Sequence, residues 1–343
     1  IKITQVFKKI FNFGVNNGTI SIGEKVMRKL FSKMDIPLFI MVVLYISLGL
    51  VMIYSASNIT AVVRYGYAPY HFFIRQALFV VAAFIIGMTI VIRFPTRNYA
   101  ALAWPLVFLL IGSLAFLFVK GKIAGGAISW YDLKFFKIQP SEFAKSILVV
   151  FMAIYYNKLH YKNVKNIYAY FVPLAFALII IGLVFMQPDL GSAAIIAGIV
   201  FLTFISIPIV QNNIMKFIKI IAVGCIIAGI AILYSGNSFL SSIQKGRLNF
   251  RNPCSRYTEI TGYQVCNGFI AINNGGLFGV GLGNSTQKYL YLPEAHTDFI
   301  FPIIVEELGL ATGILIVLGY AYILARILRI AKQSENLRCS ILA

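Results

Sequence analysis

Long apolar runs separated by short polar segments occupy the chain from about position 36 onward. A helix needs about 20 mainly apolar residues to cross a bilayer, because unpaired backbone groups are costly in hydrocarbon. Eight runs approach that length and are predicted to be spanning helices. They are Ile36–Tyr54, Phe72–Ile92, Ala100–Val119, Phe143–Tyr156, Ile167–Phe185, Ala193–Ile207, Ile214–Tyr234 and Phe299–Leu328. The fold class is therefore predicted to be all-α, a polytopic membrane helical bundle. The fourth and sixth runs are short, and fusing or dropping them would change the topology by two crossings.

Two polar segments fall outside this pattern. Residues 1–35 are basic and lack the short apolar core and cleavage site of a signal peptide, so they are predicted to be a cytoplasmic amino-terminal arm. Residues 36–343 form one transmembrane domain in this prediction. Within it, residues 235–297 form a long polar segment, and such a loop in a compact bundle is usually functional. We predict that this segment is a large extracytoplasmic loop.

The distribution of charged residues predicts how the bundle is oriented in the membrane. With the amino terminus inside, the cytoplasmic segments hold eighteen Lys and Arg and the outer segments hold ten. The excess of cations inside predicts a multi-pass protein with both termini cytoplasmic. Eight of the eleven carboxylates lie on the opposite, outer side, several of them beside apolar stretches where an ionisable group usually has a partner or a function.

Composition agrees with a membrane protein. Hydrophobic residues make up 59% of the chain and charged residues 12%, which excludes a water-soluble enzyme and a disordered chain. The formal charge of +19 would point to nucleic acid in a soluble protein. Here the cations lie mainly near the ends of the spans, so no nucleic-acid partner is expected.

Cys254 and Cys266 share one polar segment, and we favour free, small apolar cysteines over a disulfide. No zinc or other structural metal site is predicted.

The long loop contains two further candidate features. Cations around Arg247 are either a solvated basic stretch or an anion-binding segment, and the sequence leaves both open. The glycine-rich stretch 275–285 lacks the Lys-Ser or Lys-Thr of a phosphate loop, so a nucleotide site is not expected. Glycines at this density let the backbone approach other groups closely. We predict a re-entrant or tightly packed loop on the outer face.

Asp298 stands at the threshold of the last predicted span, with apolar residues directly after it. Such a carboxylate would be partly desolvated, which favours its protonated form and suits a general base. The alternative is a helix N-cap, for which Asp is among the best residues. The residues alone leave these two interpretations open.

Two more polar motifs flank apolar runs on the same side. Gln139-Pro140-Ser141-Glu142-Phe143-Ala144-Lys145 and Gln187-Pro188-Asp189-Leu190-Gly191 each place Pro near a helix start and an acid in the first turn, which is ordinary capping chemistry. Lys145 lies one turn into an apolar helix, with Glu142 three residues before it. An intramembrane ion pair or an anion-binding lysine is therefore predicted.

These motifs, in this order, resemble the SEDS family of bacterial cell-wall synthases. The resemblance covers about Asp35 to Arg329, and its third motif is Gly281-Leu282-Gly283-Asn284-Ser285 continuing to Leu292-Pro293-Glu294-Ala295-His296-Thr297-Asp298-Phe299-Ile300-Phe301. The residues of that motif resemble the division members of the family more than the elongation members. The family has ten helices, whereas this chain shows about eight. No counterpart of its last two helices or of its PLxSYGGSS-like segment occurs before Ala343, so part of the substrate cavity is expected to be missing.

The resemblance implies a peptidoglycan glycosyltransferase that polymerises lipid II at the outer face of the cytoplasmic membrane, in cell division or elongation. It assigns Asp298 to the essential aspartate, as general base of an inverting reaction. Lys145, Arg75 and Arg247 are the candidates to bind the departing diphosphate, alone or with a divalent metal (Mg²⁺ or Mn²⁺). The other substrate-binding candidates are Glu142, Asp189 and His296. No organic cofactor is expected.

The expected partners are lipid II, a class B penicillin-binding protein and other membrane proteins of the divisome or elongasome. The sequence contains no serine acyl-transfer motif set, so cross-linking must come from another chain. Two alternatives are a lipid II flippase or transporter and a non-catalytic division scaffold. Transport would distribute polar groups through the bilayer depth, whereas the carboxylates here lie mainly on one side, which favours the enzyme.

Overall fold

The computed structural model describes residues 34–87, 89, 94–124, 127–132, 137–164, 166–208 and 252–343. Most of the predicted arm 1–35, the predicted span Ile214–Tyr234, Arg247 and the first part of the predicted loop lie outside these ranges. The described residues fall into two units, with the boundary between Gly49 and Leu50 of the first helix. All contacts discussed below are within residues 50–343.

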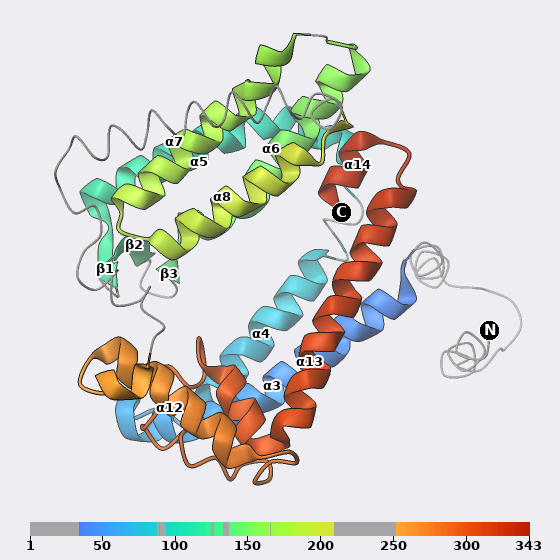
Figure 1. Cartoon of the computed structure of the whole chain (residues 1–343). Coiled ribbons are helices and arrows are strands. Elements are labelled where there is room, and N and C mark those ends of the chain that lie inside the picture. Colours follow the sequence, from blue (N-terminus) through green and yellow to red (C-terminus); the bar gives the residue numbers. More distant parts are fainter. Residues whose placement is uncertain are drawn as a thin grey trace, which may run out of the picture. The chain divides into compact units, whose positions relative to one another are not determined.

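Helices dominate the described chain (Figure 1). The longer ones are α3 (Ile36–Tyr65), α4 (His71–Ile86), α5 (Tyr99–Lys120), α6 (Pro140–Tyr161), α7 (Val172–Met186), α8 (Leu190–Ile205), α12 (Ile260–Gly275) and α13 (Ile300–Gln333). Short helices are η2 (Thr96–Asn98), η3 (Ile167–Phe171), η4 (Pro253–Arg256) and α14 (Leu337–Leu342). Every predicted span that falls within the described residues is helical there, which confirms the predicted fold class.

Four of these helices are long and apolar enough to cross a membrane. They are Ile36–Tyr65, Tyr99–Lys120, Tyr168–Met186 and Ile300–Gln333. The predicted short run at Phe143–Tyr156 belongs to the 22-residue α6, which is about 33 Å long at 1.5 Å per residue and therefore matches a bilayer core. Large apolar side chains are exposed along α3, α4 and α13, and α4 buries none of its residues. Surfaces of this kind are typical of helices that face lipid.

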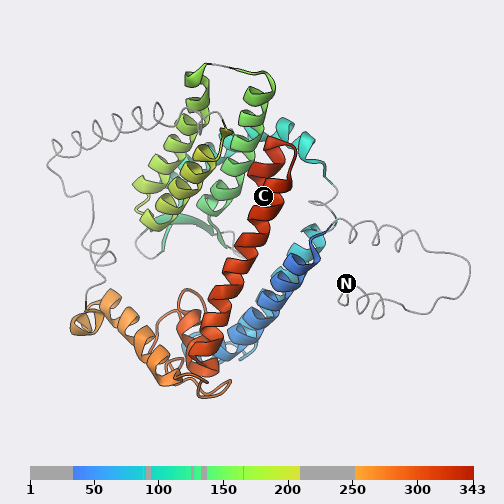
Figure 2. The ribbon, with the colours of Figure 1, turned by 45° about the vertical axis from the view of Figure 1, so that its right-hand side comes forward.

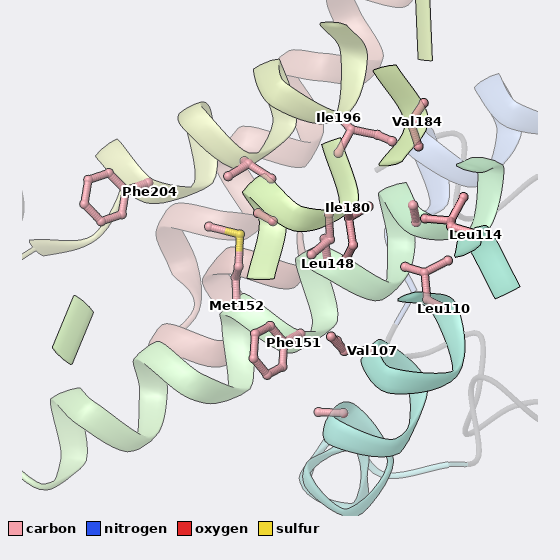
Figure 3. Packing of buried hydrophobic residues seen from close by; sticks show 14 of the residues in the cluster. Val107, Leu110, Leu114, Leu148, Phe151, Met152, Ile180, Val184, Ile196 and Phe204 are labelled. Atoms are coloured by element: carbon pink, nitrogen blue, oxygen red, sulfur yellow. The ribbon is translucent and has the colours of Figure 1, made fainter. Parts of the chain in front are cut away.

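Helices α5, α6, α7 and α8 pack side by side around one apolar core (Figures 1 and 2). Helix α6 contacts each of the other three. In Figure 3 the buried side chains of the four helices point toward one another. They include Val107, Leu110 and Leu114 of α5, Leu148, Phe151 and Met152 of α6, Ile180 and Val184 of α7, and Ile196 and Phe204 of α8. The core explains why these segments are apolar on all sides: one face packs inward and the other is left for lipid.

A small antiparallel sheet, which the sequence did not predict, follows α5. Its strands are β1 (Lys122–Ala124), β2 (Ala127–Asp132) and β3 (Lys137–Ile138), in the order β1-β2-β3. Tyr131 pairs with Ile138 across β2 and β3. The Tyr131 hydroxyl donates to the main-chain oxygen of Ser113 at 2.6 Å, which fixes the sheet to α5. Such short strands carry too little alternating pattern to be recognised.

Candidate active site

Asp298 lies in a tight turn immediately before α13. The main-chain oxygen of Glu294 accepts hydrogen bonds from the N–H groups of Thr297 and Phe299, both at 3.1 Å. The two neighbours of Asp298 are therefore fixed by one carbonyl group. The Asp298 side chain is exposed, and no hydrogen bond or ion pair joins it to another described residue. The expected desolvation of this carboxylate stays a prediction.

The capping role considered for Asp298 is also absent. The N-cap position of α13 is Phe299, and no side chain caps that end of the helix. The carboxylate is free to meet another molecule, as a general base requires.

Three helices hold the turn in place. Glu294 lies 3.9 Å from Arg64 in the last turn of α3, and its carboxylate also accepts a hydrogen bond from the Thr297 hydroxyl at 3.0 Å. The side-chain amide of Gln264, on α12, donates to the main-chain oxygen of Pro293 at 3.2 Å. The His296 ring packs against Phe72 of α4, with centroids 4.7 Å apart.

His296 is half-buried in this turn. Burial lowers the pKa of His296 from its ordinary value, the Glu294 carboxylate opposes that change, and the Arg64 guanidinium adds to it. A lowered pKa keeps the imidazole neutral near neutral pH. His296 is therefore suited to hydrogen bonding with a substrate more than to charge pairing.

A buried carboxylate cluster lies about two helical turns beyond this site. Glu306 accepts hydrogen bonds from five donors on the preceding loop and on α12. They are the hydroxyl of Ser285, the N–H and hydroxyl of Thr286 at 3.2 and 2.8 Å, the N–H of Gln287 at 3.3 Å and the side-chain amide of Asn274 at 3.2 Å. In the part of the chain that the structure describes, only uncharged donors bond to this carboxylate.

The next residue, Glu307, forms a buried ion pair with Lys288 at 2.9 Å, and their side chains are 0% and 1% exposed. Ser55 of α3 donates to both oxygens of Glu307 at 2.7 Å. The Lys288 ammonium also donates to the main-chain oxygen of Gly283 at 2.6 Å. This cluster joins α3, the glycine-rich loop and α13. The sequence analysis did not predict this cluster. The pattern that could have indicated it is a pair of acids inside an apolar helix.

The glycine-rich loop is tightly packed, as predicted, and it packs on a break in α13 that the sequence did not predict. Gly309 has φ +87°, a conformation that favours glycine, and interrupts the helix there. The N–H groups of Leu310 and Ala311 donate to the main-chain oxygens of Gly276 and Leu277. A Cβ atom on Gly279 would collide with the backbone of Glu307, so only glycine fits.

The two polar motifs on α6 and α8 meet. The side-chain amide of Gln139 donates to Asp189 at 3.0 Å, and Asp189 caps α8 by accepting from the N–H of Ser192 at 3.1 Å. The predicted ion pair of Lys145 and Glu142 is present, at 2.8 Å, with side chains 25% and 55% exposed. Asp189 thus has the capping role that its motif indicated, and its contact with substrate stays a prediction.

Of the other two predicted cations, the structure describes Arg75 but not Arg247. Arg75 is exposed on α4, its guanidinium carbon is 5.8 Å from the centroid of the Phe79 ring, and it lines an open hollow of about 270 Å³ with Tyr70 and His71. No hydrogen bond or ion pair between described residues joins Asp298 to Lys145, Arg75 or Asp189. Within the described ranges, no group of three or more His, Cys, Asp and Glu is placed to hold a metal ion.

Cys254 and Cys266 form a disulfide, which corrects the prediction of free cysteines. The bond joins η4 to α12, next to the segment that carries the candidate site. Sequence spacing could not decide this, because two cysteines 12 positions apart can lie at many distances until a helix places the two sulfurs together.

The long apolar helices define a multi-pass membrane protein, and the exposed Asp298 carboxylate marks a polar site at the amino-terminal end of α13. The chain belongs to the FtsW/RodA/SpoVE family, described as Cell cycle protein, whose model matches residues 36–343. It is 33% identical to the probable peptidoglycan glycosyltransferase FtsW of Bacillus subtilis (strain 168), over 92% of this chain and 79% of that protein. It is 31% identical to Stage V sporulation protein E of the same organism, over 90% and 82%. The family resemblance predicted from the motifs is confirmed.

Solved structures show the same fold. A chain from the structure described as "Structural coordination of polymerization and crosslinking by a peptidoglycan synthase complex" matches with a TM-score of 0.66 at 21% identity, covering 90% of this chain and 82% of that one. Rod shape determining protein RodA of Thermus thermophilus matches with a TM-score of 0.55 at 23% identity, over 90% and 79%.

Proposed function

We propose that this protein is a peptidoglycan glycosyltransferase that polymerises lipid II, with Asp298 as the general base. The names of its relatives support the activity. The observation that carries the proposal is the exposed Asp298 carboxylate, which has no described partner although the N–H groups of both its neighbours are hydrogen-bonded. Unpartnered carboxylates on fixed backbone are suited to accept a proton from a bound ligand.

The proposed reaction needs a base for the acceptor hydroxyl and cations for the departing diphosphate. Asp298 takes the proton from the acceptor sugar hydroxyl, whose oxygen then bonds to the anomeric carbon of the donor. The bond from that carbon to the diphosphate breaks, and the diphosphate leaves with the electron pair. Attack opposite the leaving group inverts the anomeric centre. Lys145, Arg75 and Arg247 are proposed to stabilise the charge that builds on the diphosphate.

We place the active site on the outer side of the membrane. The bias of Lys and Arg toward the opposite side supports this orientation. The disulfide of Cys254 and Cys266 supports it independently, because disulfides persist in oxidising extracytoplasmic compartments. The amino terminus is then cytoplasmic.

The proposal is tested by incubating the purified protein with lipid II, alone and with a class B penicillin-binding protein expressed together with it. We expect glycan polymer, and we expect the transpeptidase to co-purify from detergent. The peptidoglycan synthase complex that shares this fold supports the partner. Absence of polymer in both preparations would contradict the activity, and failure to recover the transpeptidase, with full activity of the isolated chain, would contradict the partnership.

Replacing Lys145 with methionine is expected to lower lipid II turnover about tenfold or more, because methionine fills similar space without donating to a diphosphate. Lys158, at the other end of α6, provides a matched control, and Lys158→Met should polymerise like the parent. Turnover is measured as polymer formed per folded protein. Normal turnover of Lys145→Met would mean that Lys145 only extends to the membrane interface beside Glu142.

A further inference from the structure

The turn that carries Asp298 contains a strained residue. Glu294 has φ +54°, in the left-handed region that residues other than glycine rarely adopt. Such conformations persist where surrounding contacts force them, and they gather at functional sites. The contacts of Glu294 therefore indicate what the strain maintains.

Glu294 bonds to the turn through both its main chain and its side chain. Its main-chain oxygen accepts the N–H groups on either side of Asp298, and its carboxylate accepts the Thr297 hydroxyl at 3.0 Å. The backbone oxygen and the carboxylate of Glu294 thus both bond to the same turn. Two separate parts of Glu294 thus restrict the position of the Asp298 Cα.

Arg64 adds a weaker restraint from α3. It lies 3.9 Å from the Glu294 carboxylate, and the two side chains are 52% and 44% exposed. An ion pair this long and this exposed contributes little energy. Its effect is directional, because it draws the carboxylate toward α3 while the Thr297 hydroxyl holds the other oxygen.

We propose that Glu294 is a positioning residue for the glycosyl transfer: through Thr297 and the two neighbouring N–H groups it holds Asp298 where the acceptor hydroxyl binds. This inference rests on the proposed role of Asp298. General-base catalysis requires hydrogen-bond reach, and a misplacement of about 1 Å can lower a rate about 100-fold. Glu294 itself has no contact with the reacting atoms in this assignment.

The test compares pairs of variants in the full chain with lipid II as the substrate. Glu294→Ala and Thr297→Val each remove the side-chain bond, and we expect kcat to fall about tenfold or more with KM unchanged. Glu294→Gln and Thr297→Ser keep an acceptor or a hydroxyl and should retain most of kcat. Arg64→Ala should have a smaller effect. Glu259→Ala, which breaks the exposed ion pair of Glu259 with Arg256 at 2.9 Å, is the matched control and should leave kcat unchanged.

Hydrogen exchange of the peptide spanning residues 290–301 gives a readout that does not need activity. We expect faster exchange of the Thr297 and Phe299 amides in Glu294→Ala and Thr297→Val only. Parental kcat in Glu294→Ala, a change confined to KM, or a fall in kcat without faster exchange would each overturn the positioning role. A parent chain that forms no polymer would overturn the proposed function, while the exchange measurement would still show whether Glu294 orders the turn.

Discussion

Replacing Asp298 with asparagine is expected to abolish glycan polymerisation while leaving the protein folded and in the membrane. Asparagine keeps the size of the side chain and removes the group that accepts the proton, and general-base catalysis contributes about 10²- to 10⁴-fold. Because the Asp298 carboxylate has no described partner, its replacement should not weaken folding. Polymer is measured from lipid II with purified protein, and folding by thermal unfolding in detergent.

The alternative functions give different results for this variant. If Asp298 only supported the helix end, asparagine would be nearly silent, because Asn caps a helix about as well as Asp. If the protein were a flippase or a scaffold, the parent would also form no polymer. Polymerisation by Asp298→Asn at the parental rate would therefore contradict the general-base role.

Breaking the buried ion pair of Lys288 and Glu307 is expected to destabilise the fold more than any other single change considered. Lys288→Met leaves the Glu307 carboxylate buried without its cation, and Glu307→Gln does the converse. Removing one partner of a buried pair costs about 3–5 kcal/mol. The free energy of unfolding, measured in detergent, should fall by that amount in each single variant.

The double variant Lys288→Met/Glu307→Gln separates the ion pair from simple loss of packing. It leaves no unpaired charge, so its destabilisation should be clearly smaller than the sum of the two single effects. The exposed pair of Arg256 and Glu259 serves as the control, and Glu259→Gln should change the free energy of unfolding by about 1 kcal/mol or less. Additive effects at Lys288 and Glu307 would show that their charges do not interact in the folded protein.

The membrane fold was predictable because the spans carry their own signal. The apolar runs are long enough to be recognised one at a time, and the described parts of seven of them are helical. The position of Asp298 just before α13 was also predictable, since a carboxylate at the start of an apolar helix stands out locally. The short strands after α5 and the helix α12 inside the outer loop were not, because neither has a long regular pattern.

The contacts around the site could not be predicted in the same way. Ser55 and Glu307 are 252 positions apart, and no local pattern relates a serine on α3 to an acid on α13. In the sequence Lys288 is one more cation of the polar segment 235–297, and its burial depends on how the loop folds back on α13. Long-range pairing of this kind is a property of packing, and a single sequence does not display it.

The break at Gly309 has a consequence for biogenesis. The N–H groups of Leu310 and Ala311 bond to the glycine-rich loop, which precedes α13 in the chain. The loop is therefore synthesised before the segment that needs it, and its carbonyl groups are already present when α13 enters the membrane. Backbone groups at a helix break need partners inside the protein. We expect insertion of α13 to depend on prior delivery of this loop to the same side of the membrane.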